Sequence, residues 1–372
     1  MLSLLHKKYR NLNTLHVFKD ALKHNLHLYQ KLCPQQAICP VLKSNAYGHG
    51  LSLVAQALDR ENVPFFIVDS LYEAYELKKV GIKTPILIVG CTHPDNLRGR
   101  KFPFHFAAFN FESARVLAEI KAPVHLKIDT GFSRMGFSLE ELKEALPHLK
   151  KLKLEGVYTH FADADNPTSE AKTKEQMKIF EEAVAMIRAA GFNPKWIHAG
   201  NSAGALKEQN PLLNMSRLGF ALYGISPLDP SDPFADALKD LKPAFELEST
   251  IVSIRELKKG EDVGYNCTFT AEHPMRIAVV PVGYNEALPR SLSNKGFMEV
   301  GGKMCPIVGR VCMNMTMIDI SEVENPRVYD PVIVYSKNPQ QKNSLANLAK
   351  LADLSPYEML TRINASVARR IQ

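Results

Sequence analysis

The sequence predicts two domains: an N-terminal (β/α)8 barrel over residues 1–238 and a mainly antiparallel β domain over residues 239–372. The chain is too long, at 372 residues, for one ordinary domain. Up to about residue 240, short apolar runs alternate with amphipathic runs, and eight buried strands can be counted among them. Strand–helix alternation implies parallel pairing with right-handed crossovers, and eight such units predict a closed barrel.

Each barrel element rests on its own stretch of sequence. A short strand at 13–18 and a helix at 19–32 come first. Buried strands are expected at 37–42, 65–70, 85–90, 105–110, 124–130, 154–161, 195–201 and 215–224. Amphipathic runs predict helices at 51–60, 71–81, 111–120, 138–149 and 169–191. A doubly wound open sheet is the alternative, but it would need a Gly-rich turn after the first strand and fewer units.

The second domain begins after a linker rich in proline and aspartate, "DPSDPFADALKDLKPAFELES". Runs typical of β-strands follow it at 246–257, 275–284, 296–321 and 330–336. Helices are expected only near the end, within 344–363. This pattern favours a mainly antiparallel sheet.

Composition excludes several classes of protein. Apolar residues at 45%, charged residues at 23% and a dispersed net charge of +7 are typical of a soluble globular protein without a nucleic-acid module. No run approaches membrane-spanning length, and residues 1–10 lack the pattern of a cleaved leader. The six cysteines form no CxxC pair, which predicts reduced thiols in the cytoplasm: Cys33, Cys39, Cys91, Cys267, Cys305 and Cys312.

Polar residues stand at the ends of several predicted strands. They are Lys43, Asp69, Lys127, His160, Asn201 and Arg217. The carboxyl ends of barrel strands converge on one face, where such barrels keep their active sites. We therefore expect these residues to line one pocket.

The stretch "CPVLKSNAYGHG", from Cys39 to Gly50, contains the most informative of them. Lys43 stands where a buried strand should end, and a desolvated lysine loses its proton and forms Schiff bases with carbonyls. Tyr47 adds a hydroxyl, and Gly48 and Gly50 would let backbone approach a ligand. A lysine that merely snorkels from a strand end is the alternative.

This stretch resembles the pyridoxal-phosphate lysine motif of the alanine racemase family. Four further segments match that family in order: "HLKIDTGFSRMGF", "GVYTHFADAD", "NMSRLGFALYG" and "VGRVCMNM". The resemblance covers most of the chain. It implies a fold-type III pyridoxal-phosphate enzyme that interconverts L- and D-alanine and supplies D-alanine for the peptidoglycan of a cell wall.

The resemblance also implies how the cofactor is held. Lys43 would bond to it, Arg217 would face its pyridine nitrogen and His160 would lie at its ring. The phosphate would be held by Tyr47, Ser202 and the backbone of Gly219 and Phe220. Simpler readings exist: Ser202 as a helix N-cap, Arg217 as a structural ion-pair member and His160 as a core histidine, with no metal-ligand spacing around it.

Racemisation needs a base on each face of the substrate, because a proton leaves one face and returns to the other. The family implies Lys43 as one base and Tyr265 of a partner subunit as the other, hence a homodimer with shared active sites. Tyr265 could otherwise be an ordinary strand aromatic. Arg134 and Met313 would bind the substrate carboxylate, and Tyr284, Arg290 and Arg310 would line the entrance.

Lys127 would be a second buried cation beside Arg134, and two buried cations repel each other. In many racemases of the family the equivalent lysine is carbamylated. An unmodified Lys127 that pairs with Asp129 or another acid is the alternative.

Some positions depart from the family. Asn314 replaces the usual Asp, "GYNEALPR" replaces the common "GYADG" type, and Ala365 stands near the place of a phosphate-binding tyrosine. A pocket without that ring would accept serine as well as alanine.

Two rival functions are also compatible with these residues. One is a pyridoxal-phosphate decarboxylase of the same fold, with Cys312 as the proton donor. The other is a non-catalytic pyridoxal-phosphate-binding protein.

Overall fold

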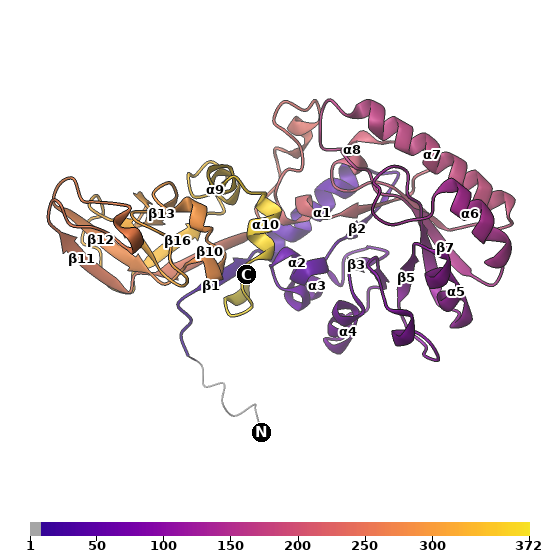
Figure 1. Cartoon of the computed structure of the whole chain (residues 1–372), viewed down its shortest axis with the longest axis horizontal. Coiled ribbons are helices and arrows are strands. Elements are labelled where there is room, and N and C mark those ends of the chain that lie inside the picture. Colours follow the sequence, from indigo (N-terminus) through magenta and orange to yellow (C-terminus); the bar gives the residue numbers. More distant parts are fainter. Residues whose placement is uncertain (1–8) are drawn as a thin grey trace, which may run out of the picture. The chain divides into compact units, whose positions relative to one another are not determined.

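The computed structural model describes residues 9–372, and these form two compact units (Figure 1). The barrel unit comprises residues 21–46 and 51–242. The β unit comprises 47–50, 243–372 and the described part of 1–20. Residues 1–8, where no leader is expected, lie outside the described residues.

The barrel unit is built on eight parallel strands in the order β2-β9-β8-β7-β6-β5-β4-β3. Their bounds are β2 Ala37–Pro40, β3 Phe66–Val68, β4 Ile86–Ile88, β5 His105–Ala108, β6 Pro123–Lys127, β7 Lys153–Tyr158, β8 Trp196–His198 and β9 Met215–Leu218. The two end strands approach through a parallel bridge between Val41 and Ile67, and the amide of Leu42 donates to the carbonyl of Ile67 at 2.7 Å. All eight expected strands are present, and the predicted (β/α)8 barrel is confirmed.

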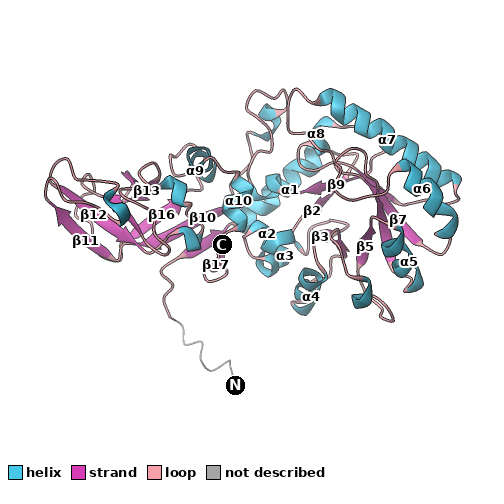
Figure 2. Cartoon of the chain, in the orientation of Figure 1, coloured by secondary structure: helices cyan, strands magenta, loops and turns pink. Residues whose placement is uncertain are grey.

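The strands form where the sequence predicts them because most of their residues are apolar and buried. Every residue of β3 and β4 is buried, for example. The helices lie around the strands (Figure 2). They are α1 Lys19–Leu32, α2 Lys43–Tyr47, α3 Leu51–Leu58, α4 Leu71–Lys79, α5 Phe111–Glu119, α6 Leu139–Ala145, α7 Glu170–Ala189 and α8 Gly204–Lys207. Ser70, Asn110 and Ser138 cap α4, α5 and α6 with their side-chain oxygens.

The β unit contains a six-stranded sheet in the order β14-β13-β16-β10-β1-β17 and a three-stranded sheet in the order β11-β12-β15. Their bounds are β1 Thr14–Val17, β10 Phe245–Thr250, β11 Ser253–Leu257, β12 Met275–Val280, β13 Phe297–Val300, β14 Lys303–Pro306, β15 Thr316–Asp319, β16 Pro331–Tyr335 and β17 Ala368–Ile371. Only the β1–β17 pair is parallel among the named pairs of these sheets. The mainly antiparallel second domain is therefore confirmed.

The earliest described strand, β1, pairs with β10 and β17 in the β unit rather than with a barrel strand. The division expected at residue 238 stays a prediction. The β unit also carries α9 Leu345–Ala352 and α10 Pro356–Thr361. Short 3-10 turns complete both units: η2 Pro94–Asn96, η3 Leu146–His148, η4 Phe220–Tyr223, η5 Ala235–Leu238, η6 Tyr265–Cys267, η7 Tyr284–Glu286 and η8 Arg290–Leu292. Across residues 9–372, no helix is both long and apolar enough to cross a membrane.

Candidate active site

Lys43 opens a turn with the opposite hand to an ordinary helix. Ser44, Asn45, Ala46 and Tyr47 all have φ between 52° and 56°. None is glycine, and this conformation costs about 1–2 kcal/mol for each L-residue. Strained backbone of this kind gathers at functional sites, where surrounding contacts hold it in place.

The contacts that hold this turn come from a buried carboxylate on α4. Glu73 is 8% exposed and accepts the amide of Asn45 at 3.3 Å and the amide of Asp69 at 2.9 Å. Asn45 in turn accepts the amide of Leu51, the first residue of α3, at 2.8 Å. Half-buried Lys43 therefore leaves a turn that is fixed to the carboxyl end of β3.

Arg217 on β9 carries a buried charge that no acid neutralises. Its guanidinium donates to Nδ1 of His198 and Nδ1 of His160, each at 2.9 Å, and to the carbonyls of Thr159 and Ala199, each also at 2.9 Å. All these acceptors are neutral, and burial lowers the pKa of Arg217 to about 10. Within the described residues Arg217 belongs to no ion pair. Its interpretation as a member of a structural ion pair is therefore wrong.

These bonds fix the tautomers of the histidines. A guanidinium can only donate, so Nδ1 of both His198 and His160 accepts and Nε2 carries the proton. Burial, reinforced by Arg217, lowers the pKa of both imidazoles well below their ordinary value. His160 is thus a neutral group beside a fixed cation, consistent with a place at a cofactor ring.

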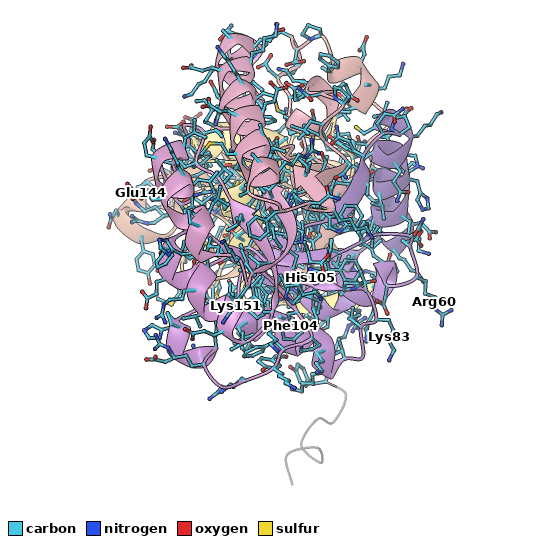
Figure 3. All side chains as sticks on the ribbon, turned by 90° about the vertical axis from the view of Figure 1, so that its right-hand side faces the viewer. Arg60, Lys83, Phe104, His105, Glu144 and Lys151 are labelled. Carbon is cyan, nitrogen blue, oxygen red and sulfur yellow. The ribbon has the colours of Figure 1, made fainter. Side chains whose placement is uncertain are left out.

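Two further histidines, His125 and His105, continue this arrangement into the barrel, and neither is predicted from the sequence. Nε2 of His198 lies 3.0 Å from Nδ1 of His125, whose own Nε2 has no partner within the described residues. The ring of His105 lies 5.7 Å beyond, and Figure 3 labels it beside Phe104. A Cβ on Gly156 would overlap the His125 ring, so only glycine allows this approach. The available signal was spacing: His125 and Lys127 are two residues apart and share one face of β6.

Several cations surround this region of the barrel unit. Lys127 is 4% exposed, and its pKa is lowered to about 8, first by burial and then by Arg134, Arg217 and, to a smaller degree, Lys43. Exposed Arg134 lies over the ring of Phe132 at 4.2 Å, and that ring contacts His160 edge-on at 5.4 Å.

Asp129 forms no ion pair with Lys127 in the described part of the chain. Its Oδ1 instead accepts the amides of Gly131 and Phe132 at 3.0 Å and of Ser133 at 3.1 Å. The alternative in which Lys127 pairs with Asp129 is therefore wrong. Carbamylation of Lys127 stays a prediction.

Ser202 lies where two segments after β8 and β9 meet. Its Oγ accepts the amides of Gly219 at 3.1 Å and Ala221 at 3.5 Å. Ser202 is not the N-cap of α8, which is Ala203, and Oδ1 of Asn201 accepts the amide of Gly204 at 2.8 Å. A hydroxyl and amides at the end of the last barrel strand suit a phosphate, and a guanidinium without a counter-ion suits a pyridine nitrogen. The residues present therefore fit pyridoxal phosphate.

The remaining candidates lie in the β unit, and four of them, Tyr265, Met313, Tyr284 and Arg290, are exposed. Tyr265 is 68% exposed and opens η6, so its interpretation as a strand aromatic is wrong. Met313 is 57% exposed and Tyr284 is 45% exposed.

The other β-unit candidates differ in their surroundings. Arg290 on η8 is exposed, whereas Arg310 is half-buried with an unpartnered Nε within the described residues. Tyr47 packs 6.0 Å from the ring of Tyr357, and burial raises its pKa to about 12.

The structure thus gathers the candidates into two sets. In the barrel unit are Lys43, Lys127, Arg134, His160, Ser202, Arg217, Gly219 and Phe220, and in the β unit are Tyr47, Tyr265, Tyr284, Arg290, Arg310 and Met313. Within the first set, burial and then the charges of Lys43, Arg134 and Arg217 all lower the pKa of Lys127 and the pKa of His160.

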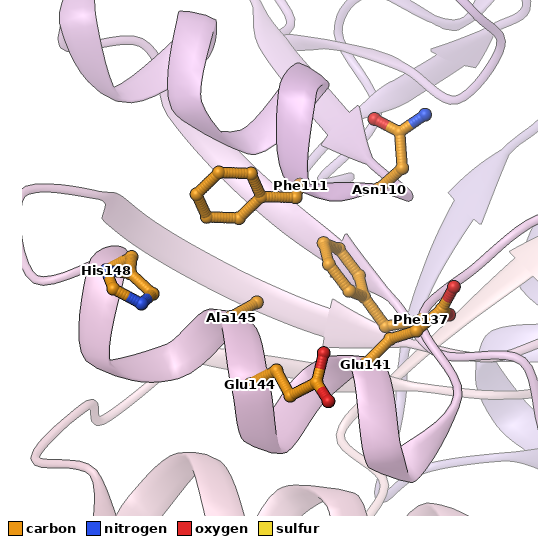
Figure 4. Close-up of a pocket in the computed structure, with 7 residues that line it drawn as sticks. All are labelled: Asn110, Phe111, Phe137, Glu141, Glu144, Ala145 and His148. Carbon is orange, nitrogen blue, oxygen red and sulfur yellow. The ribbon is translucent and has the colours of Figure 1, made fainter.

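A separate hollow of about 470 Å³ lies between α5 and α6 (Figure 4). It is lined by Asn110, Phe111, Phe137, Glu141, Glu144, Ala145 and His148. None of the candidate residues lines it. Buried charge and fixed tautomers mark the site in the barrel unit.

Comparison with known proteins gives one consistent result. Residues 17–227 match the family model "Alanine racemase, N-terminal domain", and residues 244–371 match "Alanine racemase, C-terminal domain". The chain is 37% identical to the alanine racemase of Staphylococcus carnosus over 369 residues, covering 95% of this chain and 93% of the relative. It is 36% identical to that of Geobacter sulfurreducens over 364 residues, 94% of each chain.

Solved structures agree. The alanine racemase of Clostridium difficile 630 aligns with a TM-score of 0.89 at 32% identity, covering 98% of this chain and 97% of that one. The alanine racemase of Bacillus anthracis with bound L-Ala-P aligns with a TM-score of 0.88 at 29% identity, covering 98% and 96%.

Proposed function

The chain belongs to the alanine racemase family, and we propose that it interconverts L- and D-alanine with pyridoxal phosphate by a two-base mechanism. The observation that carries the proposal is Arg217, a buried guanidinium whose partners are all neutral. Such a cation opposes protonation of a pyridine nitrogen by like-charge repulsion. Decarboxylases of the same fold usually place an acid there, so Arg217 argues against that rival.

Pyridoxal phosphate, when bound, makes the α-proton of an amino acid acidic by withdrawing electron density into its ring. Lys43, Arg217 and His160 would hold its aldehyde and ring end. Ser202, Gly219, Phe220 and Tyr47 would hold its phosphate. The second domain argues against a mere carrier of the cofactor, because such carriers are single barrels.

The two bases would stand on opposite faces of the substrate. Nζ of Lys43 would take or return the proton on one face, and the hydroxyl of Tyr265 from a second copy of the chain would do so on the other. Arg134 and Met313 would hold the carboxylate. The exposure of Tyr265, Met313 and Tyr284 on the β unit supports a homodimer in which this surface meets a partner's barrel.

The proposal also covers the entrance to the site and the cellular compartment of the protein. Tyr284, Arg290 and Arg310 would narrow the entrance, and positive charge there would attract a carboxylate. All six cysteines are free, which supports a reducing cytoplasm. D-alanine made there would supply peptidoglycan.

The test is α-proton exchange in D2O combined with optical rotation, starting from each enantiomer. Wild-type protein should exchange and racemise both. Tyr265→Phe should lose racemisation by about 10²–10⁴-fold, yet exchange the proton of D-alanine through Lys43 better than that of L-alanine. Tyr329→Phe, at an equally exposed tyrosine of the β unit (66%), is the control and should behave as wild type.

Lys43→Ala should abolish racemisation and the borohydride-reducible link to the cofactor. Equal residual exchange from both enantiomers in Tyr265→Phe would remove Tyr265 from its role. A cofactor link that survives in Lys43→Ala would show that another lysine carries it.

A further inference from the structure

Two loops of the β unit lie against each other beneath exposed side chains. The first, residues 283–288, carries Tyr284, and the second, residues 312–315, carries Met313. The amide of Tyr284 donates to the carbonyl of Cys312 at 3.1 Å, and that of Asn285 donates to the carbonyl of Met313 at 2.9 Å. A Cβ on Gly283 would collide with both carbonyls, so only glycine permits this approach.

A buried carboxylate joins these loops. Glu286 is 6% exposed, and its Oε2 accepts the amide of Gly283 at 2.9 Å. Its Oε1 accepts Nδ2 of Asn285 at 2.9 Å and Nδ2 of Asn314 at 2.8 Å. Among residues 9–372 no cation forms an ion pair with it. A buried charge is costly unless hydrogen-bonded, and hydrogen bonds to an ionised acceptor are the strong ones.

The Asn314 amide is the only one of these donors that comes from the second loop. An ionised aspartate there could accept but not donate. It would also place a second negative charge within hydrogen-bond distance of the first, which is destabilising. The amide at 314 and the carboxylate at 286 are therefore chemically complementary.

We propose that Glu286 and Asn314 are positioning residues that fix the loop carrying Met313 against the loop carrying Tyr284. In this way they set how well the β unit binds the substrate carboxylate. The inference rests on the proposed function, in which Met313 contacts that carboxylate and Tyr284 lines the entrance. Neither positioning residue needs to touch the substrate.

Kinetics provide the first test. Asn314→Asp should raise the KM for alanine about tenfold or more while kcat changes less than about threefold, because the proton-moving groups lie elsewhere. Asn314→Ala removes the donor without adding charge and should raise KM less. The exchanged pair Glu286→Gln with Asn314→Asp restores one donor and one acceptor, so it should recover part of the loss seen in Asn314→Asp. Asn325→Asp adds the same charge at an exposed turn of the same unit and is the control.

Amide hydrogen exchange tests the inference by a measurement that does not depend on enzyme activity. Peptides covering 283–288 and 312–315 should exchange faster in Asn314→Asp and Asn314→Ala than in Asn325→Asp, with other peptides unchanged. If the wild type fails to racemise alanine, the proposed function fails, and this measurement still decides the loop contact. KM within about twofold of the control together with unchanged exchange would overturn the inference, as would equal KM values for Asn314→Asp and the exchanged pair. Should Asn314→Asp not fold, Asn314→Ala decides by the same criteria.

Discussion

Each unit buries a charge that has no counter-ion within residues 9–372, Arg217 in the barrel unit and Glu286 in the β unit, and the two are held differently. In the barrel unit, Arg217 on β9 is surrounded by acceptors at the ends of β7 and β8: two imidazoles and two carbonyls. In the β unit, Glu286 is surrounded by one backbone amide and two side-chain amides, all on loops. Strand ends are fixed by sheet hydrogen bonds and packing, whereas loops can rearrange.

The difference shows how a site can keep a charge available for chemistry. Neutral dipoles satisfy the hydrogen-bonding needs of the ion but leave its charge uncancelled. Where that charge must face a ligand, as proposed for Arg217, a rigid frame prevents relaxation. Where it only fastens two segments, as proposed for Glu286, a loop suffices.

The largest expected effect is the loss of stability when either buried charge, Arg217 or Glu286, is removed from the groups that surround it. Arg217→Met leaves several fixed acceptors unpaired and should lower the free energy of unfolding by about 3 kcal/mol. Glu286→Gln keeps the shape and one acceptor, and its loops can admit water, so about 1 kcal/mol is expected. Urea unfolding of both variants without cofactor measures this. Equal losses would contradict the distinction between rigid and adaptable frames.

The next effect concerns the histidines behind Arg217. His125→Leu removes the acceptor for Nε2–H of His198, so Arg217 should lose its orientation and the affinity for pyridoxal phosphate should fall about tenfold. His125→Asn keeps an acceptor near the place of Nδ1 and should stay within about threefold of wild type. Fluorescence titration of apoprotein measures both. Exposed His148→Asn in the same unit is the control, and matching losses in the Leu and Asn variants would refute the role of the hydrogen bond.

Sequence predicted the barrel well because local pattern carries that information. The stretch 66–68 is apolar throughout, and a strand buried on both faces must be so. The partner of Thr14–Val17 could not be predicted in the same way. Its pairing with Phe245–Thr250 and Ala368–Ile371 is decided by segments more than two hundred residues away.

The site was predicted where a residue stands at a strand end and missed where a residue acts through another. Lys43 and Arg217 were found by position, whereas His198 and Glu286 look like ordinary buried residues in one sequence. The left-handed turn after Lys43 was also missed, since residues 44–47 include no glycine. The hydrogen bonds of Asn45 with Glu73 and with the amide of Leu51 are among the contacts that hold that turn.

A smaller expected effect is a pH dependence of the stability that is due to Lys127. The pKa of Lys127 in the folded protein is about 8, against an ordinary 10.5, because burial and nearby cations disfavour its charge. The unfolded chain therefore binds more protons between these values, and unfolding free energy should rise with pH from about 8 to 10.5 relative to Lys127→Met. Urea midpoints in buffer free of carbon dioxide measure the difference. A difference independent of pH would show that Lys127 keeps an ordinary pKa.

The smallest expected effect concerns selectivity, and it depends on Ala365. This exposed residue lies in the β unit between α10 and β17. The resemblance to the family implies that it, or a neighbour, takes the place of a tyrosine. A missing ring removes both an aromatic wall and a hydroxyl, and pockets discriminate one extra small group by only about 1–3 kcal/mol. We therefore expect serine to be racemised alongside alanine, with a preference for alanine well below a thousandfold.

Ala365→Tyr should sharpen that preference about tenfold, because the ring would again exclude the hydroxymethyl group. Ala365→Ser changes the polarity without adding a ring and should leave selectivity unchanged. The measurement is kcat/KM for L-alanine and L-serine under one condition. A wild-type preference for alanine beyond about a thousandfold, roughly 4 kcal/mol, would show that another side chain already fills the place of the ring. Since Ala365 lies outside the acid–base pair, that outcome would leave the racemase proposal intact.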